Sequence, residues 1–313
     1  MTITQFQYVL AVAKYKNFTT AAENSFVTQP TLSMQIQKLE EELGVIIFDR
    51  SKKPLQITEI GEQIIKQAQV IVNESDRMND IVAQQKGIVG GEFRMGIIST
   101  VSPTLLPMFL ANFIHKYPKV SLKIEEQNTE NILQKIEEGS YDAAILATPL
   151  NHPNIIEKPL YYEPFVAYIP DNHRLQANKT IYSEDLDIND ILMLEDGHCF
   201  KESVLNICNQ DIIESKKYFQ LKSGSFETLI RLANEGLGMT LIPYLHSLEL
   251  KESEKKHIHL FAEPYPAREI SLIYHKNELK LQTVKALYEV ISGVIRGAIA
   301  FQNVKIISPT RRK

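Results

Sequence analysis

The sequence predicts an α/β protein of several domains, with an N-terminal winged helix-turn-helix, a long linker helix and a C-terminal two-lobed α/β domain. Three observations carry this prediction. Residues 4–44 show apolar positions at helical spacing, interrupted by tight turns. An apolar seam without a helix breaker runs through residues 58–86. From residue 92 onward strand and helix patterns alternate, as in a sheet covered by helices.

Length and composition indicate a globular protein of two or three domains. The chain has 313 residues, 44% of them hydrophobic, and a formal net charge of −4, so charge alone gives no case for nucleic acid. Its first residues lack the features of a signal peptide, and its most apolar late run, residues 290–301, is too short to cross a bilayer. Two cysteines do not make a disulfide framework. We therefore expect a cytoplasmic protein with no membrane partner.

Residues 1–58 predict three short helices and a wing. Apolar residues at helical spacing predict a first helix over residues 4–14. Residues 20–23 (TAAE) have the pattern of a capping box and predict the start of a second helix. Thr28 is the expected N-cap of a third helix, which ends at Gly44. Three helices with a tight turn between the second and third are typical of a helix-turn-helix.

The third helix and the wing carry side chains suited to DNA. Short and amide side chains on such a helix can hydrogen-bond base edges in a major groove. The strand-like residues 45–48 and 55–58 enclose a basic hairpin tip that suits phosphates. A plain helical bundle is the alternative, since residues 1–60 hold six basic and six acidic residues. The candidate DNA-binding residues are Gln29, Pro30, Thr31, Ser33, Gln37, Arg50, Lys52 and Lys53.

Residues 59–90 predict a linker helix followed by a hinge. A helix of this length cannot bury its apolar seam alone, so we expect a coiled coil with a second copy of the chain. Packing of the helix on its own domain is the alternative. Gly87 and the pair Gly90-Gly91 then break the helix and predict the hinge.

Residues 91–313 predict a two-lobed α/β domain with a largely parallel sheet. Strands and helices alternate up to a buried strand at residues 143–147, and a last helix is expected over residues 281–301. Two crossovers between the lobes enclose a cleft, where ligands usually bind. The predicted lobes are lobe I, about 91–164 and 268–313, and lobe II, about 165–267.

Both cysteines lie in one segment, residues 192–208. A strand is expected to end at Leu194, acidic and glycine residues then turn the chain, and Cys199 begins a segment with helical spacing. The unpaired N–H groups of a helix N-terminus favour a thiolate, and His198 can add a hydrogen bond or a proton. Cys199 is therefore a candidate reactive thiol. Apolar residues surround Cys208, for which packing is the simpler interpretation.

The spacing of the cysteines limits how they can bond to each other. A disulfide needs Cα atoms within about 7 Å, whereas nine residues of helix hold them roughly 13 Å apart at about 1.5 Å per residue. Residues 200–207 must therefore change shape if the two sulfurs bond. One histidine with two cysteines lacks a fourth ligand at zinc spacing, and we expect neither a metal nor a cofactor.

A set of short motifs extends over about sixty N-terminal residues. It consists of residues 21–22 (AA), 28–33 (TQPTLS), Ile36, 39–40 (LE), 43–44 (LG), 48–50 (FDR) and 58–61 (TEIG). These motifs closely resemble those of LysR-type transcriptional regulators. The resemblance implies binding to promoter DNA, a homodimer or a homotetramer built as a dimer of dimers, contact with RNA polymerase, and a regulatory domain like the periplasmic binding proteins.

Within this family the cysteine segment resembles that of the hydrogen-peroxide sensors, which activate oxidative-stress genes. Residues 194–199 (LEDGHC) together with Cys208 carry this resemblance. It implies that Cys199 attacks peroxide to give a sulfenic acid, that Cys208 closes a disulfide, and that His198 poises the thiol. Ser102 and Ala267 depart from the family pattern, at the edges of the pocket. The peroxide-binding residues implied by the resemblance are Thr100, Thr129, Gly197 and Arg268.

Other interpretations stay open at this level. A regulator of the same family can bind a small metabolite in the cleft between the lobes, with incidental cysteines. A thiol enzyme such as a peroxidase is a further alternative, although an enzyme needs no groove-reading helix. Among the site residues, Thr100 and Thr129 can instead cap the helices that follow them, and Arg268 can form a surface ion pair.

Overall fold

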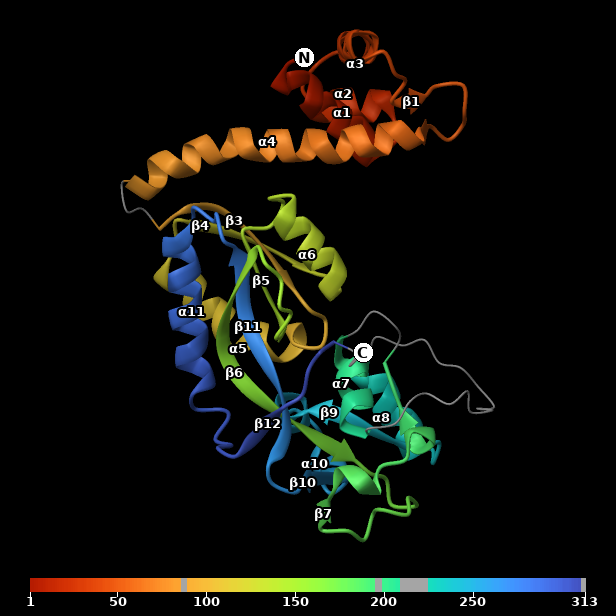
Figure 1. Cartoon of the computed structure of the whole chain (residues 1–313), viewed down its shortest axis with the longest axis vertical. Coiled ribbons are helices and arrows are strands. Elements are labelled where there is room, and N and C mark those ends of the chain that lie inside the picture. The colour runs from red at the N-terminus through yellow and green to blue at the C-terminus, as the bar shows by residue number, and fades with distance from the viewer. Residues whose placement is uncertain (86–88, 195–198, 209–224, 311–313) are drawn as a thin grey trace. The chain divides into compact units, whose positions relative to one another are not determined.

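The computed structural model describes residues 1–85, 89–194, 199–208 and 225–310 (Figure 1). The chain divides into two compact units, Met1–Ile88 with Glu137–Ser140, and Val89–Ile136 with Tyr141–Lys313. No described helix is both long enough and apolar enough to cross a membrane.

The N-terminal unit contains three helices, a short two-stranded wing and a long helix. Apolar side chains on one face of each helix meet in a common core, in which Leu32, Ile36 and Leu39 are fully buried. The bounds of the elements are α1 Ile3–Tyr15, α2 Phe18–Asn24, α3 Gln29–Leu43, β1 Phe48–Asp49, β2 Gln56–Ile57 and α4 Glu59–Gln85.

Polar caps set where the first two helices begin. Thr2 and Gln5 form a reciprocal capping box at the start of α1. At α2 the predicted capping box at residues 20–23 is wrong, because the helix begins earlier. The Asn17 carboxamide oxygen accepts from the backbone N–H groups of Thr19 and Thr20, at 2.8 and 3.1 Å.

A buried carboxylate fixes the wing to the end of α3. Strands β1 and β2 pair antiparallel, with Phe48 opposite Ile57. Glu40 Oε1 accepts from the backbone N–H groups of Ile47 and Phe48, at 2.7 and 3.1 Å. Gly44 ends α3 in the left-handed conformation, at φ 70°, as predicted.

The apolar seam of the 27-residue helix α4 is only partly used within its own unit. Ala68 and Val72 are buried in the core that the helix shares with α1–α3. Farther along, Met78 and Ile81 are 64% and 50% exposed. Packing on its own domain therefore accounts for the first half of the seam, and the coiled coil stays a prediction for the second half.

The second unit is built on a mixed sheet with helices on both sides. Figure 1 shows α11 and α6 on opposite sides of the strands of lobe I. The bounds are β3 Gly91–Ile97, α5 Ser102–Lys116, β4 Val120–Glu126, α6 Thr129–Glu137, β5 Ala143–Thr148, β6 Ile155–Tyr168, β7 Thr180–Ile181, η1 Ser183–Asp185, η2 Ile188–Asp190, β8 Ile191–Leu192, α7 Cys199–Cys208, α8 Phe226–Asn234, β9 Met239–Pro243, α9 Tyr244–Leu248, α10 Glu252–Lys255, β10 Ile258–Phe261, β11 Tyr265–His275, α11 Leu281–Ile295 and β12 Val304–Ile306.

Two long strands, β6 and β11, join the lobes. The strand order is β4-β3-β5-β11-β6-β10-β7. Strand β3 pairs parallel with β4 and β5, but β11 runs antiparallel to both β5 and β6. The predicted parallel pairing is therefore confirmed for β3, β4 and β5, but the sheet as a whole is mixed, because the two strands that pass between the lobes run in opposite directions. The predicted pair of crossovers corresponds to these strands.

Each lobe has its own buried core. One core contains side chains of β3, β5, α5 and α11, and the other contains side chains of β9, α7 and α8. The last helix ends at Ile295 instead of residue 301. Gly297 is a poor helix former, and the chain turns there so that β12 can pair parallel with β11. Ile307 then enters the core of lobe II.

Candidate functional site

The predicted DNA-contacting residues lie on α3 and on the wing. Gln29, Pro30 and Thr31 are exposed in the first turn of α3. Thr28 occupies the N-cap position but makes no capping bond, because its hydroxyl lies 2.8 Å from the Thr31 hydroxyl. The exposed Gln37 donates to Glu41 at 3.1 Å. The first turn of α3 therefore presents exposed polar side chains at the start of the helix.

Arg50 has structural partners that the sequence did not indicate. Its guanidinium donates to Ser33 Oγ at 3.1 Å and to Glu40 Oε2 at 3.0 Å, and it lies 5.0 Å from the centre of the Phe18 ring. Arg50 therefore holds the wing against α3. Lys52 and Lys53 are exposed at the tip of the wing, where phosphates are accessible.

The cysteine segment forms a helix, as predicted. α7 begins at Cys199 and ends at Cys208, so the two thiols lie at opposite ends, and both are free. A helix of this length keeps their Cα atoms roughly 13 Å apart. The predicted site residues Gly197 and His198 lie outside the described residues.

Cys199 lies at the junction of the lobes. Its side chain packs against the core of lobe I, whereas the next residue, Phe200, is buried in the core of lobe II. Opposing effects act on its thiolate. Burial raises the pKa of Cys199 above its ordinary value, while the Thr129 side chain, the charge of Arg268 and the backbone of Ala147 and of Cys199 itself act in the opposite direction. Loss of solvation therefore outweighs the groups that favour the thiolate, including the backbone at the start of the helix.

Arg268 is the centre of a buried polar cluster beside this thiol. It is 2% exposed, and its Nε and Nη2 atoms donate to Glu163 Oε2 at 3.0 and 2.8 Å. It also donates to the side-chain and backbone oxygens of Thr100, both at 2.9 Å, and lies 5.3 Å from the centre of the Phe200 ring. The alternative of a surface ion pair is therefore wrong, because both charges are buried.

The two threonines do not cap the helices that follow them. Val101 occupies the N-cap position of α5, and the Thr100 hydroxyl accepts from Arg268. Before α6, Asn128 Oδ1 accepts from the backbone N–H of Asn131 at 2.8 Å. The buried Thr129 Oγ1 has no hydrogen-bond partner among the described residues. Its hydroxyl is therefore available to the thiol or to a small ligand.

Sequence reasoning missed three residues of this cluster, namely Tyr161, Glu163 and Phe200. Glu163 Oε1 also accepts from the backbone N–H of Leu245 at 3.0 Å, so the carboxylate links β6 to α9. The Tyr161 hydroxyl is buried without a partner among the described residues, and burial raises its pKa well above the usual value. An acidic residue two positions before the apolar residues 165–169 is the signal that could have drawn attention to Glu163.

Cys208 has a different environment. It is 5% exposed in the core of lobe II, and burial, followed by the charge of Asp187, raises its pKa to about 12. Nearby, the C-terminal tail crosses α7. The Asn206 amide donates to the backbone oxygens of Ser308 and Thr310, both at 3.0 Å. The tail therefore supports α7 in its helical form.

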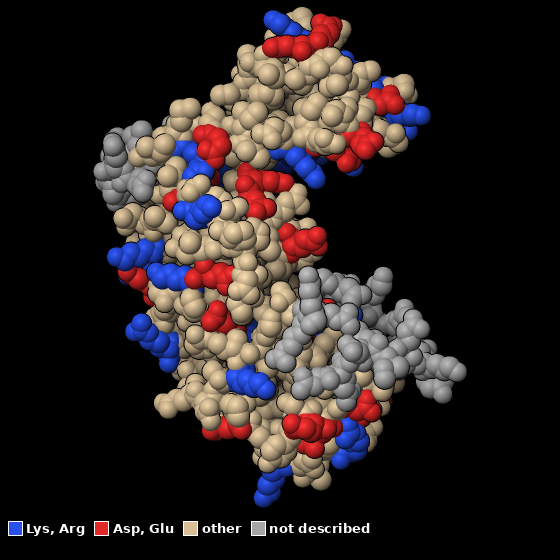
Figure 2. Space-filling model, viewed as in Figure 1, with Lys and Arg blue, Asp and Glu red and all other residues tan. Residues whose placement is uncertain are grey.

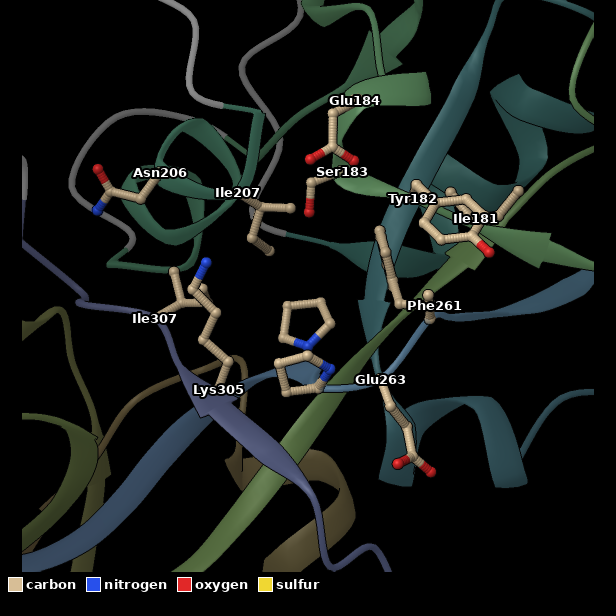
Figure 3. A pocket seen from close by; sticks show the side chains of 13 residues that line it. Ile181, Tyr182, Ser183, Glu184, Asn206, Ile207, Phe261, Glu263, Lys305 and Ile307 are labelled. Carbon is tan, nitrogen blue, oxygen red and sulfur yellow. The ribbon is translucent and has the colours of Figure 1, made fainter.

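A cavity of about 200 Å³ lies next to this end of α7. It is formed by η1, the end of α7, the turn between β10 and β11, and β12, and Figure 3 shows Ser183, Ile207 and Phe261 around it. Neither Cys199 nor the two threonines line it. Among the residues that the structure describes, no group of three histidine, cysteine or acidic side chains is placed to hold a metal ion.

A helix-turn-helix unit, a linker helix and a two-lobed domain with a buried polar site define a ligand- or redox-responsive transcriptional regulator. Two family models identify the family to which this regulator belongs. Residues 3–62 match the bacterial regulatory helix-turn-helix proteins of the lysR family, and residues 86–295 match the LysR substrate binding domain. The chain belongs to the LysR family, which confirms the predicted fold class.

Similar proteins include two named transcriptional regulators. The hydrogen peroxide-inducible genes activator of Pectobacterium carotovorum subsp. carotovorum is 31% identical over 95% of this chain and 96% of its own length. The DNA-binding transcriptional dual regulator OxyR of Escherichia coli (strain K12) is 30% identical over 95% of each chain. The predicted resemblance to the peroxide sensors is therefore confirmed.

Solved structures agree with this similarity. A full-length cysteine-to-aspartate variant of OxyR from Pseudomonas aeruginosa has a TM-score of 0.74 and 30% identity, and the match covers 93% of this chain and 94% of that one. A hydrogen-peroxide-bound cysteine-to-serine mutant of OxyR from Corynebacterium glutamicum has a TM-score of 0.64 and 26% identity, over 97% and 98% of the two chains.

Proposed function

We propose that this protein senses hydrogen peroxide through Cys199 and controls oxidative-stress genes as a DNA-binding regulator. One observation supports the proposal most. Cys199 lies at the start of α7, where the side chain of Thr129 and the charge of Arg268 both lower the pKa of its thiol. The similar proteins named as peroxide-inducible activators add to this support.

In the first step the Cys199 thiolate attacks one oxygen of hydrogen peroxide. The O–O bond breaks, the leaving hydroxide takes up a proton and departs as water, and the sulfur becomes a sulfenic acid. Because burial raises the pKa of Cys199, the thiolate depends on the opposing effects of Thr129 and Arg268. Thr100, Gly197 and His198 are the further groups proposed to contact peroxide or the thiol.

In the second step the Cys208 sulfur attacks the sulfenic sulfur. An S–S bond forms, the S–O bond breaks, and the hydroxyl leaves as water. Since a disulfide needs Cα atoms within about 7 Å, α7 must open. Opening removes Cys208 from the core of lobe II and separates Asn206 from the tail. Oxidation is thereby converted into a change of shape.

The DNA-binding units act as a set. We propose a homodimer through the exposed second half of the α4 seam, and a homotetramer built from two such dimers, which binds promoter DNA in the cytoplasm and contacts RNA polymerase. Each DNA-binding unit offers few free cations. The binding of several linked units to one DNA molecule compensates for this, because linked binding events raise the overall affinity. The candidate contacts are those of α3 and of the wing tip.

A footprint on the DNA upstream of the protein's own gene tests this function. We expect micromolar peroxide to shift the footprint of the wild type and to leave that of Cys199→Ser unchanged. A shift that persists in Cys199→Ser would show that the thiol is not the sensor.

Mass spectrometry separates the remaining alternatives. Our proposal expects a 199–208 disulfide in stoichiometric amount after peroxide treatment. A regulator that binds a metabolite in the cleft would form no such bond, and a thiol peroxidase would consume peroxide continuously with a reductant.

A further inference from the structure

The DNA-reading helix carries one exposed apolar side chain. Met34 is 60% exposed on α3, whereas its neighbours Leu32 and Ile36 are fully buried. On a helix, residues three and four apart share a face. Met34 therefore shares its face with Pro30 and Gln37, two of the predicted DNA contacts.

The polar groups around Met34 are largely engaged within the protein. The Ser33 hydroxyl accepts from Arg50, and the side-chain and backbone oxygens of Gln35 accept from Gln5 at 3.4 Å. From residue 29 to residue 37 the sequence contains no lysine or arginine, and the first cation of α3 is Lys38. The base-reading part of this helix therefore has amides and a thioether but no cation.

Contacts of cations with phosphates position a protein on DNA, whereas contacts with base edges select the sequence. On the face drawn in Figure 2, Lys and Arg side chains are interspersed with Asp and Glu side chains instead of forming one basic patch. The guanidinium of Arg50, which contacts α3, is already hydrogen-bonded to Ser33 and Glu40. Sequence discrimination at this helix must therefore come from short-range contacts.

We propose that Met34 is a specificity-determining residue that recognises the C5-methyl group of thymine in the major groove. Guanine is usually read by Arg or Lys, adenine by Asn or Gln, and the thymine methyl group by an apolar side chain. A flexible thioether adapts well to such a methyl contact. Gln29 is available to hydrogen-bond an adenine. We therefore expect α3 to select half-sites in which A·T base pairs face Met34. This inference rests on DNA binding by the α3 unit, and not on the response to peroxide.

Replacement of single thymines by deoxyuridine tests the contact, because it removes only the C5-methyl group. The probe is the footprinted upstream DNA, bound by the full-length reduced protein at fixed salt. We expect one thymine in each half-site at which the replacement weakens wild-type binding about fourfold, the effect of burying one methyl-sized group. In Met34→Ala the same replacement should change nothing, which is a double-mutant cycle across the interface.

Two controls distinguish a base contact from a loss of structure. Met34→Leu keeps an apolar side chain and should keep most of the sensitivity to uracil. Ile114→Ala changes another exposed apolar side chain, 50% exposed on α5, and should keep all of the sensitivity to uracil. The proposal is overturned if no thymine distinguishes wild type from Met34→Ala, or if Met34→Ala weakens binding equally on thymine and uracil probes.

The outcome is separable from that of the proposed function. If peroxide fails to shift the footprint while the uracil effect is present, the sensing proposal fails and the thymine contact stands. If the shift occurs without any uracil effect at Met34, the contact fails and the sensing proposal stands.

Discussion

The two ends of α7 hold chemically identical thiols in unlike surroundings. At the start of the helix, Cys199 packs against lobe I and feels the charge of Arg268 and the hydroxyl of Thr129. At its end, Cys208 lies in the apolar core of lobe II, with Asp187 as the charge that affects it. Burial raises both pKa values, but groups that favour a thiolate surround only Cys199.

This difference explains how one helix can separate two steps of a reaction. A thiol with groups that support its anion can react while the helix is intact. A thiol in an apolar core is unreactive until the helix opens, because desolvation disfavours the charged form. The order of the two steps is thereby built into the packing.

The largest expected effect is the difference in thiol reactivity. A pKa of about 12 in place of 9.0 lowers the thiolate fraction of Cys208 by about a thousandfold near neutral pH. In Cys199→Ser, alkylation of Cys208 by iodoacetamide should therefore be about a thousandfold slower in the native protein than in urea. In native Cys208→Ser, iodoacetamide should label Cys199 faster than it labels Cys208 in native Cys199→Ser.

The pH dependence provides the control. Because the pKa of each thiol is raised above 9.0, both labelling rates should rise about tenfold per pH unit between pH 7 and pH 8.5 without a plateau. A plateau for Cys199 below pH 8 would mean that its anion is stabilised far more than the packing indicates.

The buried ion pair at the Cys199 end gives the next effect. In Arg268→Met, Glu163 keeps its charge in a site with 1% exposure and loses both guanidinium hydrogen bonds. We expect unfolding in urea to show a loss of about 3 kcal/mol, as for other buried pairs with one partner removed.

The double variant Arg268→Met with Glu163→Leu should recover much of this loss, because it leaves no buried charge. Equal stability of wild type and the single variant would contradict the buried pairing. Labelling of Cys199 should slow in both variants, since each lacks the charge that favours the thiolate.

Much of this site could be predicted from the sequence, and the remainder depends on tertiary packing. The helical spacing after Cys199 and the glycine after α3 are local signals, and both elements form where predicted. The direction of the Cys199 pKa shift was not predictable, because it depends on how deeply lobe I covers the sulfur. A helix N-terminus is visible in sequence, whereas desolvation is not.

Partners distant in sequence were missed for a related reason. Glu163 and Arg268 lie on β6 and β11, next to each other in the sheet but 105 positions apart along the chain. Pattern reasoning identifies each strand without its register, so it could not exclude a surface ion pair for Arg268, which only the family resemblance placed near the thiol. Arg50 shows the same limit, because its bond to Ser33 depends on how the wing folds against α3.

The smallest expected effect concerns the tail that crosses α7. Asn206→Ala removes two hydrogen bonds to tail carbonyls and leaves Cys208 in place. Each net hydrogen bond contributes about 1 kcal/mol, so the closed helix should lose about 1–2 kcal/mol relative to the opened one. We expect the 199–208 disulfide to form several-fold faster from the sulfenic acid, followed by mass spectrometry after a pulse of peroxide.

A matched variant isolates the role of the tail. Asn154→Ala removes an exposed contact with Lys276 in lobe I, at 2.7 Å, and should leave the rate unchanged. If Asn206→Ala and wild type close the bond equally fast, opening of α7 does not limit the second step. Burial in the apolar core would then be the whole reason why Cys208 is unreactive. The difference in thiol reactivity between the two ends of α7 would depend on desolvation, without any contribution from the tail.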